Sequence, residues 1–302
     1  MLIENRKKSY KGLNNYTDNS LPGLVYFYNA DFTLLKDAIQ TYLEKTLSIW
    51  YNKPYVIRTD KQLHNSIKDI MGLPNLTPNG NIIPKKETAK YYTKIQQEVN
   101  NCLKQLNIFH KIDKFVCTNI MVKFPINDSK ILNRPHYTGK MHSDAWPGHV
   151  GDAIMMAGIL GDIEGSTVEY FKPINPHDNF LELASSYDEG NTRYDDIEYI
   201  GKMVSNKFVV MDQACLHRTK FLNNSKTRVS INFGALMMNS INKDIATTKR
   251  WEDSYFSNSM FDKLGTDYVL EVDETLQECH DKYKSNSNTI QLPNNGIYFK
   301  KI

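Results

Sequence analysis

The sequence predicts an all-β core with flanking helices, an α+β organisation in which a β sandwich or barrel forms the centre of the protein. Eight short segments between residues 115 and 237 are rich in β-branched and aromatic residues, and turn residues separate them. Earlier in the chain, apolar residues recur instead at the spacing typical of helices. No repeat, low-complexity tract or clear linker divides the chain, so we expect one domain spanning residues 1–302.

Residues 1–112 are expected to form a mainly helical N-terminal part. GLVYFY at 23–28 predicts a strand, and Asp31 can then serve as the N-cap of the first helix. Gly72 is expected to end the second helix, and the segment 73–84 is expected to be a loop. The apolar spacing predicts these helices over residues 31–46, 61–71 and 86–107.

Residues 113–240 are expected to form the β core, and residues 241–302 a C-terminal extension. The predicted strands cover residues 115–124, 136–144, 153–160, 166–172, 199–204, 207–212, 214–220 and 228–237. The polar segment 173–198 lies between two of them and is expected to be a lid or a surface loop. The extension is expected to contain helical patches near 250–263 and 272–284 and a hairpin around 293–296.

The composition favours a soluble cytoplasmic protein. Lys and Arg total 37 against 34 Asp and Glu, and no basic run is long enough to suggest nucleic acid as a partner. No apolar stretch approaches the length that spans a bilayer, and the N-terminus lacks the apolar segment of a signal peptide. The cysteines form no CxxC pair and no disulfide-like spacing, which favours a reducing compartment. They are Cys102, Cys117, Cys215 and Cys279.

The stretch HSDAWPGH, residues 142–149, contains a candidate metal half-site. On a strand, side chains two residues apart point to the same face, so His142 and Asp144 are expected to share one cavity. The pair alone is a weak signal, because an HxD sequence arises easily by chance. His217 in a later predicted strand would add a second imidazole. Two histidines and one carboxylate on one face of a metal suit non-haem Fe(II) and O2 chemistry.

A candidate anion-binding pair follows in the next predicted strand. Arg228 stands eleven residues after His217, and Ser230 is two residues further on the same strand face. A guanidinium beside a hydroxyl can hold a carboxylate at two points. The two residues therefore favour a site for an organic acid close to the metal.

HxD at 142–144, His217 and RVS at 228–230 together resemble the Fe(II)/2-oxoglutarate-dependent oxygenases. The resemblance covers about residues 115–237 and implies a double-stranded β-helix, the cupin-like jelly roll of that family. The strand and helix at 23–46 look like the usual N-terminal element of the fold. HSDAWPGH and the later GSTVEYFKP are similar to the branch found in bacterial carbohydrate gene clusters, and more loosely to the phytanoyl-CoA hydroxylase group.

The resemblance implies a role for each motif residue. His142, Asp144 and His217 would hold Fe(II), and 2-oxoglutarate would chelate the iron while its far carboxylate pairs with Arg228, helped by Ser230. O2 would take the last position, and the reaction would release succinate and CO2. Related halogenases carry a small residue in place of the carboxylate ligand. Because Asp144 is present, hydroxylation, desaturation or ring closure is expected rather than halogenation.

Substrate contacts are expected just after the ligands. Trp146 and His149 lie where a substrate would approach, and an aromatic face suits a sugar ring, although a loop tryptophan that packs in the core is an equally ordinary outcome. The expected substrate is a small polar metabolite or a carbohydrate, with a nucleotide-linked sugar as one form. Lys123, on the strand before the site, could offer its charge to a carboxylate, but a solvent-facing lysine is the default expectation. A homo-oligomer is also open, with the C-terminal hairpin as its interface.

Two alternatives compete with the oxygenase. One is a cupin-type metal enzyme that does not use 2-oxoglutarate, and Arg228 argues against it because that chemistry needs no anchor for a dicarboxylate. The other is a non-catalytic jelly-roll binding protein. The intact set of three ligands argues against a pure binder, which has no reason to assemble them.

Overall fold

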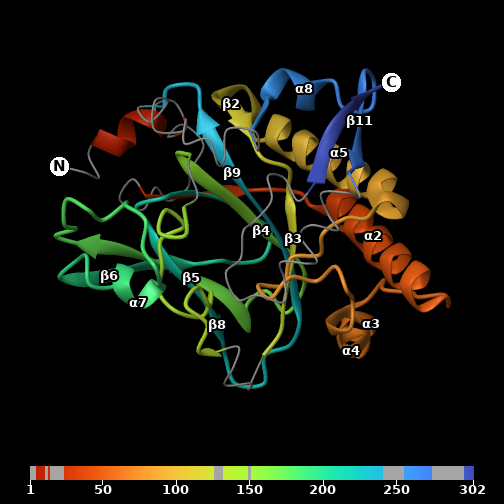
Figure 1. The fold of residues 1–302 in the computed structure, drawn as a ribbon, viewed down its shortest axis with the longest axis horizontal. Helices are drawn as coiled ribbons and strands as arrows, with labels where there is room; N and C mark the ends of the chain where they lie inside the picture. The colour runs from red at the N-terminus through yellow and green to blue at the C-terminus, as the bar shows by residue number, and fades with distance from the viewer. Residues whose placement is uncertain are drawn as a thin grey trace.

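Mostly antiparallel β-sheets form the centre of the protein, with several helices packed beside them (Figure 1). The computed structural model describes residues 5–10, 13, 24–125, 132–148, 151–240, 255–273 and 296–302. The larger sheet contains β1 (Val25–Asn29), β2 (Ile112–Phe115), β3 (Asn119–Lys123), β4 (Ala153–Gly161), β7 (Lys207–Asp212), β9 (Arg228–Met237) and β10 (Phe256–Ser257). Its order is β1–β7–β4–β9–β2–β10, and β3 also pairs with β9.

A smaller sheet packs against the larger one. It contains β5 (Ser166–Ile174), β6 (Asp196–Lys202) and β8 (Leu216–Phe221), in the order β6–β5–β8. A single bridge between His142 and His217 adds the segment before the HxD turn to this sheet. From β4 onward the chain crosses to the smaller sheet for β5 and β6, returns for β7, crosses again for β8 and returns for β9. This crossing pattern is consistent with the predicted jelly roll.

Successive side chains of a strand point to opposite faces of the sheet, and this alternation determines which residues lie between the two sheets. In β9, Val229 and Ile231 point toward the helices, so Arg228 and Ser230 point the other way, into the space between the sheets. There Met211 of β7 joins an apolar cluster with residues of β5 and β8. A buried arginine and a serine thus share an otherwise largely apolar interior.

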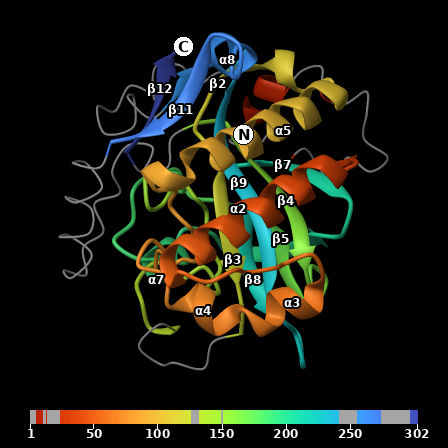
Figure 2. The same ribbon diagram turned by 90° about the vertical axis from the view of Figure 1, so that its right-hand side faces the viewer.

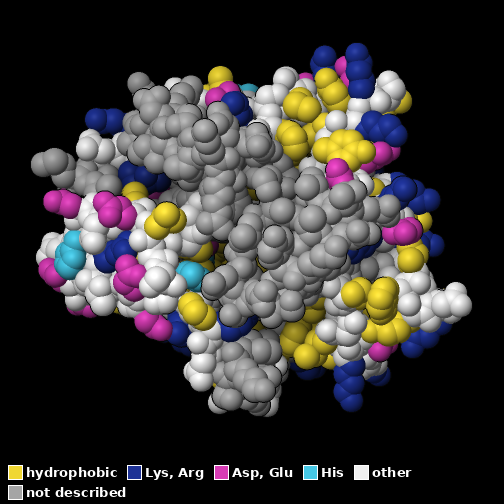
Figure 3. Space-filling view, in the orientation of Figure 1, with side chains coloured by type: hydrophobic (Ala, Val, Ile, Leu, Met, Phe, Trp, Pro, Cys, Tyr) yellow, Lys and Arg dark blue, Asp and Glu magenta, His cyan; other side chains and the backbone are white. Residues whose placement is uncertain are grey.

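Helices cover the outer face of the larger sheet, as Figure 2 shows for α2 and α5. In the part of the chain that the structure describes, the helices are α2 (Thr33–Tyr51), α3 (Asp60–Asn65), α4 (Ile67–Met71), α5 (Ala89–Gln105), α7 (Tyr187–Gly190) and α8 (Asn258–Asp262), with short 3-10 turns at Lys7–Tyr10, Lys86–Thr88 and Phe109–Lys111. Of these, α7 lies beside the smaller sheet (Figure 1). Both α2 and α5 bury one apolar face, for example Ile39 and Val99, in the core beneath them. Among the described residues, no helix is long and apolar enough to cross a lipid bilayer. On the face shown in Figure 3, basic and acidic side chains are interspersed.

Four predicted strands, 153–160, 166–172, 207–212 and 228–237, are confirmed almost to the residue. The strand predicted at 115–124 is instead divided into β2 and β3. At the division, α5 supplies the hydrogen-bond partners that a neighbouring strand would otherwise provide. The side chain of Gln96 accepts the Thr118 N–H at 2.9 Å, and the Tyr92 hydroxyl donates to the Thr118 carbonyl at 2.5 Å.

Three other predicted elements differ. The strand predicted at 136–144 is a series of turns with one bridge at His142. The helix predicted at 61–71 is interrupted at Ser66, which ends α3 and precedes α4. The helix predicted at 250–263 is reduced to α8 among the described residues, where it follows the short strand β10.

The C-terminal extension also contains a pair of antiparallel strands. They are β11 (Tyr268–Val272) and β12 (Ile297–Lys301). Residues 274–295 lie outside the described residues, and with them most of the helix predicted at 272–284 and the turn of the predicted hairpin.

A buried ion pair fixes the N-terminal segment to the end of β7. Arg6 Nε donates to Asp212 Oδ1 at 2.6 Å, and the Tyr10 hydroxyl donates to Asp212 Oδ2 at 2.7 Å. The same carboxylate accepts the Ala214 N–H at 2.6 Å, which shapes the turn between β7 and β8. That turn leads directly into the strand that carries His217.

Candidate metal centre

Three potential ligands converge beside the smaller sheet. His142 Nε2 lies 3.8 Å from Asp144 Oδ1, and His217 Nε2 lies 3.6 Å from Asp144 Oδ2. One donor atom from each residue lies within 4.8 Å of the other two, and no other such group of three occurs among the described residues. The two imidazoles and the carboxylate therefore face a common point that one metal ion can occupy.

Backbone pairing brings the two histidines together. The His142 N–H donates to the His217 carbonyl at 3.0 Å, and the His217 N–H donates back to the His142 carbonyl at 2.9 Å. This reciprocal pair places the imidazoles side by side, with ring centroids 4.1 Å apart. Asp144 reaches the same point from the turn that follows, not from strand alternation as predicted.

Ser143 holds the backbone between the two ligands. Its hydroxyl donates to the Gln213 carbonyl at 2.7 Å and accepts the Ala145 N–H at 3.1 Å. Ser143 is fully buried. Gln213 belongs to the turn that Asp212 shapes, so the N-terminal ion pair and the HxD turn are parts of one hydrogen-bonded unit.

His142 is oriented and kept neutral for coordination. Its Nδ1–H donates to the Lys140 carbonyl at 2.8 Å, which leaves Nε2 directed at Asp144. Burial, together with the neighbouring His217, lowers the pKa of His142 to about 3. A neutral imidazole with a free Nε2 lone pair is the form that binds a metal.

Tyr187 packs directly on this ligand and has no signal in the sequence that marks it. Its ring stacks on His142 with centroids 4.2 Å apart and an interplanar angle of 15°, and it meets His136 edge-on at 5.0 Å. Tyr187 is the first residue of α7, within the segment predicted to be a polar lid or loop. Its position shows that this segment supports the metal centre.

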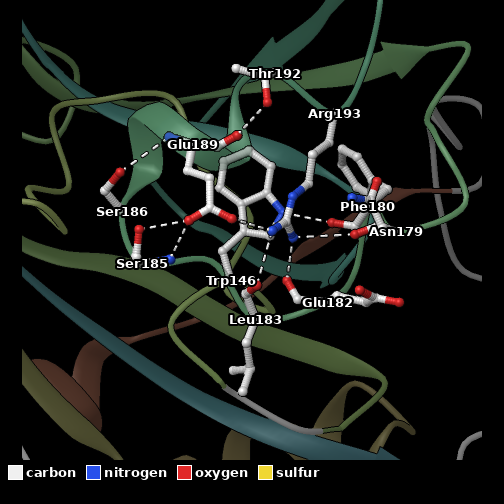
Figure 4. A network of polar contacts seen from close by, with 10 residues as sticks. All are labelled: Trp146, Asn179, Phe180, Glu182, Leu183, Ser185, Ser186, Glu189, Thr192 and Arg193. Carbon is white, nitrogen blue, oxygen red and sulfur yellow. Dashed lines mark hydrogen bonds and ion pairs between the residues drawn. The ribbon is translucent and has the colours of Figure 1, made fainter.

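A buried arginine folds that segment into a compact unit (Figure 4). Arg193 donates through Nη1 to the carbonyls of Asn179 and Glu182, at 3.2 and 2.7 Å. Its Nη2 donates to the Leu183 carbonyl at 2.9 Å and pairs with a carboxylate oxygen of Glu189 at 2.6 Å. Four acceptors around one guanidinium fix the loop before α7 and the end of α7 relative to each other.

Trp146 belongs to the same unit, and the structure corrects its predicted contact with substrate. The indole has no exposed surface, and its N–H donates to the Phe180 carbonyl at 2.6 Å. Gly190 allows this packing, because a Cβ atom there would lie 2.2 Å from the indole ring. Trp146 thus joins the HxD turn to the Arg193 unit. His149, the other predicted contact, lies outside the described residues.

Tyr187 is expected to act as a positioning residue for His142. Tyr187→Leu removes the stacked ring, so we expect metal affinity to fall roughly 10-fold, as for other supports of a ligating imidazole. Tyr187→Phe keeps the ring and is expected to retain near wild-type affinity. Calorimetric titration with Zn(II) measures both variants. Equal affinities for the leucine and phenylalanine variants would contradict this role.

Arg228 and Ser230 lie on one face of β9 between the sheets, with 1% and 6% of their surfaces exposed. Arg228 Nη1 donates to the Ser166 carbonyl at 2.5 Å, while its Nε is buried without a hydrogen-bond partner. Burial lowers the pKa of Arg228 to about 10, and no carboxylate among the described residues pairs with it. A buried guanidinium in this state favours an anionic ligand, because an uncompensated buried charge is costly.

Lys123 is partly buried and its ammonium group is bonded to the protein, so the default expectation of a solvent-facing lysine is wrong. It pairs in register with Arg228, and its Nζ donates to the Asn79 carbonyl at 2.7 Å and to Thr138 Oγ1 at 2.8 Å. Burial, followed by repulsion from Arg228 and Arg134, lowers the pKa of Lys123 to about 7. A second cation therefore lies beside the predicted carboxylate anchor.

No family model and no curated protein matches the sequence. Among solved structures, the chain is similar to the non-heme alpha-ketoglutarate-dependent epimerase SnoN from nogalamycin biosynthesis, with 8% identity, 69% of this chain and 76% of that chain covered, and a TM-score of 0.35. It is also similar to the non-heme alpha-ketoglutarate-dependent carbocyclase SnoK from nogalamycin biosynthesis, with 10% identity, 64% of this chain and 83% of that chain covered, and a TM-score of 0.36. The chain is similar as well to a prolyl 4-hydroxylase from Phytophthora capsici, with 12% identity, 76% of this chain and 72% of that chain covered, and a TM-score of 0.33.

Proposed function

We propose that the protein is a non-haem Fe(II)- and 2-oxoglutarate-dependent oxygenase that hydroxylates a small molecule and releases succinate and CO2. One observation carries the proposal. The triad of His142, Asp144 and His217 lies beside the inter-sheet space that also contains Arg228, whose charge no carboxylate among the described residues neutralises. The candidate metal site and the candidate anion site therefore face the same space between the two sheets.

The donor set favours iron. Two neutral imidazoles and one carboxylate leave coordination positions open for a bidentate ligand and for O2, as in non-haem Fe(II) oxygenases. His142, Asp144 and His217 would hold this ion. When bound, iron and 2-oxoglutarate would supply the oxidising power for O2 activation. Because Asp144 supplies a ligand, no position is vacated for a halide, which supports hydroxylation over halogenation.

Arg228 and Ser230 fit the far carboxylate of 2-oxoglutarate. Both side chains project from the same face of β9, and the partnerless Nε of Arg228 is a donor directed into a buried space. A carboxylate there would accept from the guanidinium and from the serine hydroxyl. The alternative of a metal enzyme without 2-oxoglutarate gives this buried charge no partner.

The protein's own side chains would orient the reaction and exclude water. Lys140 and Tyr187 hold the His142 ring, as described above. Apolar residues of the inter-sheet cluster, including Met211 and Leu216, line the interior next to the site. The strand order of the two sheets supports assignment of the fold as a double-stranded β-helix, with the ligands on the smaller sheet and the anchor on the larger.

The proposal is tested by anaerobic addition of Fe(II) and then 2-oxoglutarate to the purified protein. We expect the weak visible charge-transfer band of the Fe(II)–2-oxoglutarate chelate. Absence of this band from the wild-type protein would sink the proposal. A band in the wild-type protein whose 2-oxoglutarate affinity does not depend on Arg228 would instead mean that the carboxylate anchor is misassigned.

The Arg228→Met variant distinguishes a role of Arg228 in binding 2-oxoglutarate from a role in stabilising the fold. Loss of charge-assisted hydrogen bonds is expected to weaken 2-oxoglutarate binding at least about 10-fold while Fe(II) remains bound. Replacing Arg228 removes its hydrogen bond to the Ser166 carbonyl but leaves no described carboxylate unpaired, so the free energy of unfolding should fall by no more than about 1–3 kcal/mol. Titration of the band and urea unfolding measure the two effects. Arg218→Met, on the outer face of β8 beside Glu169, is the matched control and should bind 2-oxoglutarate normally.

A further inference from the structure

Two asparagines of the larger sheet, Asn119 and Asn232, point into the space between the sheets. On β9, Ile231 and Phe233 pack in the core beneath the helices, so Asn232 between them points to the opposite face. On β3, Ile120 packs in the same core, so Asn119 shares a face with Asn232, its partner in register. Both asparagines are only partly buried, although they face the interior.

The row of the larger sheet that contains Asn232 lies across from the row that contains His217. Asn232 pairs in register with Met156 of β4. The Tyr170 hydroxyl donates across the interior to Met156 Sδ at 3.2 Å, and Tyr170 of β5 is the register partner of His217. One hydrogen bond therefore joins the two rows.

A second contact shows how the two rows are aligned. Lys123 of β3 donates to Thr138 Oγ1 at 2.8 Å, and Thr138 belongs to the turns that lead to His142. Thus β4 lies over β5, and β3 lies over the His142 side of the smaller sheet. Between them, β9 lies beside β4 and β3, and β8 lies beside β5 and the His142 bridge. The two asparagines therefore lie across from the two ligand histidines.

The asparagine pair presents both a donor and an acceptor without partners. Asn81 Oδ1 accepts the Ile120 N–H at 3.1 Å, so Asn81 Nδ2 is the atom that donates to Asn119 Oδ1 at 2.9 Å. This leaves Asn119 Nδ2 as a donor that bonds to no described residue. Asn232 Oδ1 is buried and has no hydrogen-bond partner among the described residues. A buried acceptor left unpaired is costly, so the pair favours a ligand.

A hydroxyl or a carboxamide fits this pair, because each both donates and accepts hydrogen bonds. Residues paired in register have Cβ atoms about 5 Å apart, so one such group can reach both amides. It would donate to Asn232 Oδ1 and accept from Asn119 Nδ2.

The cosubstrate does not fit this position. 2-Oxoglutarate offers only acceptors at neutral pH, so it has no proton to donate to Asn232 Oδ1. Its proposed anchor, Arg228, stands four residues before Asn232, about 13 Å away along an extended strand. The unpaired acceptor therefore favours a second ligand.

We propose that Asn119 and Asn232 recognise the molecule to be oxidised, and that this substrate carries an uncharged hydroxyl or carboxamide held by the two amides. The inference rests on the proposed function, because it takes the triad as the reacting centre. Met156, buried beside Asn232, adds an apolar contact for the carbon body of the substrate. An ionised acid, which only accepts, would leave Asn232 Oδ1 unpaired, so the pair would select neutral polar substrates over anionic ones.

Three probes of similar size test the assignment by NMR. Cyclohexanol and cyclohexanecarboxamide donate and accept hydrogen bonds, whereas methoxycyclohexane only accepts them. Each probe is titrated into the protein loaded with 2-oxoglutarate and Mn(II), whose paramagnetism relaxes the protons of a probe bound near the triad. The Zn(II) protein supplies the diamagnetic reference. We expect the first two probes to be relaxed and to bind at least about 10-fold more tightly than methoxycyclohexane.

The Asn232→Leu variant removes the acceptor and keeps a side chain of similar size. It should lower the affinity for cyclohexanol at least about 10-fold and leave the affinity for methoxycyclohexane unchanged. Because the variant removes an unpaired buried oxygen, its free energy of unfolding should not fall, which separates recognition from a structural role. Asn101→Leu, on the exposed face of α5 beside Glu98, is the matched control and should bind all three probes like the wild-type protein.

Three results would overturn the inference. The first is equal affinity for the three probes, or an affinity for cyclohexanol that Asn232→Leu leaves unchanged. The second is absence of Mn(II)-dependent relaxation of cyclohexanol and cyclohexanecarboxamide. The third is loss of 2-oxoglutarate affinity in Asn232→Leu, which would assign the amides to the cosubstrate.

The chelate band, recorded with Fe(II) on the same protein, keeps the two proposals apart. A missing band contradicts the oxygenase itself. A normal band without relaxation of the probes contradicts only the assignment of Asn119 and Asn232 to the substrate.

Discussion

His217→Ala is expected to lower affinity for Fe(II) more than about 100-fold and to eliminate turnover of 2-oxoglutarate. Even residues that only support a ligating histidine cost 10–100-fold when they are removed. His217 contributes a donor atom itself, 3.6 Å from the carboxylate of Asp144. Metal content after anaerobic loading and gel filtration measures the loss directly.

His177→Ala is the matched control for this prediction. His177 is about half exposed and lies 3.5 Å from Asp195, away from the triad. The His177→Ala variant should bind Fe(II) with the same affinity as the wild-type protein. Retention of iron by the His217 variant, or equal loss in both variants, would contradict the assignment of the ligands.

Asp212→Asn is expected to lower the free energy of unfolding by about 3–5 kcal/mol. The Asp212 carboxylate accepts hydrogen bonds from Arg6 and Tyr10 in a buried site, as well as from the Ala214 N–H. A neutral amide would remove the carboxylate that pairs directly with the buried Arg6 guanidinium. Urea unfolding followed by circular dichroism measures the change.

Asp267→Asn gives the comparison for a surface carboxylate. Asp267 is about half exposed and pairs with Lys263 at 3.3 Å. Replacing it should therefore lower the free energy of unfolding by less than about 1 kcal/mol. Comparable small effects at Asp212 and Asp267 would refute the view that the N-terminal segment is fixed by a buried ion pair.

The sequence could predict the ligands because residue type and order along the chain carry that signal. His142, Asp144 and His217 are chemically specific, and the RVS strand adds a cation at a plausible spacing. Their geometry was less predictable. Residues 134–148 include Pro135 and Gly139, which favour turns, so Asp144 reaches the metal point from a turn and not from a strand.

Other features depend on distant partners that local sequence does not identify. Trp146 is buried because Phe180 and Gly190 pack around it. Tyr187 stacks on His142 from a segment that Arg193 holds in place. Lys123 is withdrawn from solvent by the loop that contains Asn79. By contrast, α2 and α5 were predictable because each buries one face, which leaves a periodic apolar pattern.

Anomalous diffraction at the iron edge, from crystals grown anaerobically with Fe(II) and 2-oxoglutarate, tests the central claim most directly. We expect one iron peak between His142, Asp144 and His217, with the far carboxylate of 2-oxoglutarate on Arg228. An iron peak elsewhere, no bound iron, or a 2-oxoglutarate carboxylate held away from Arg228 would contradict the account.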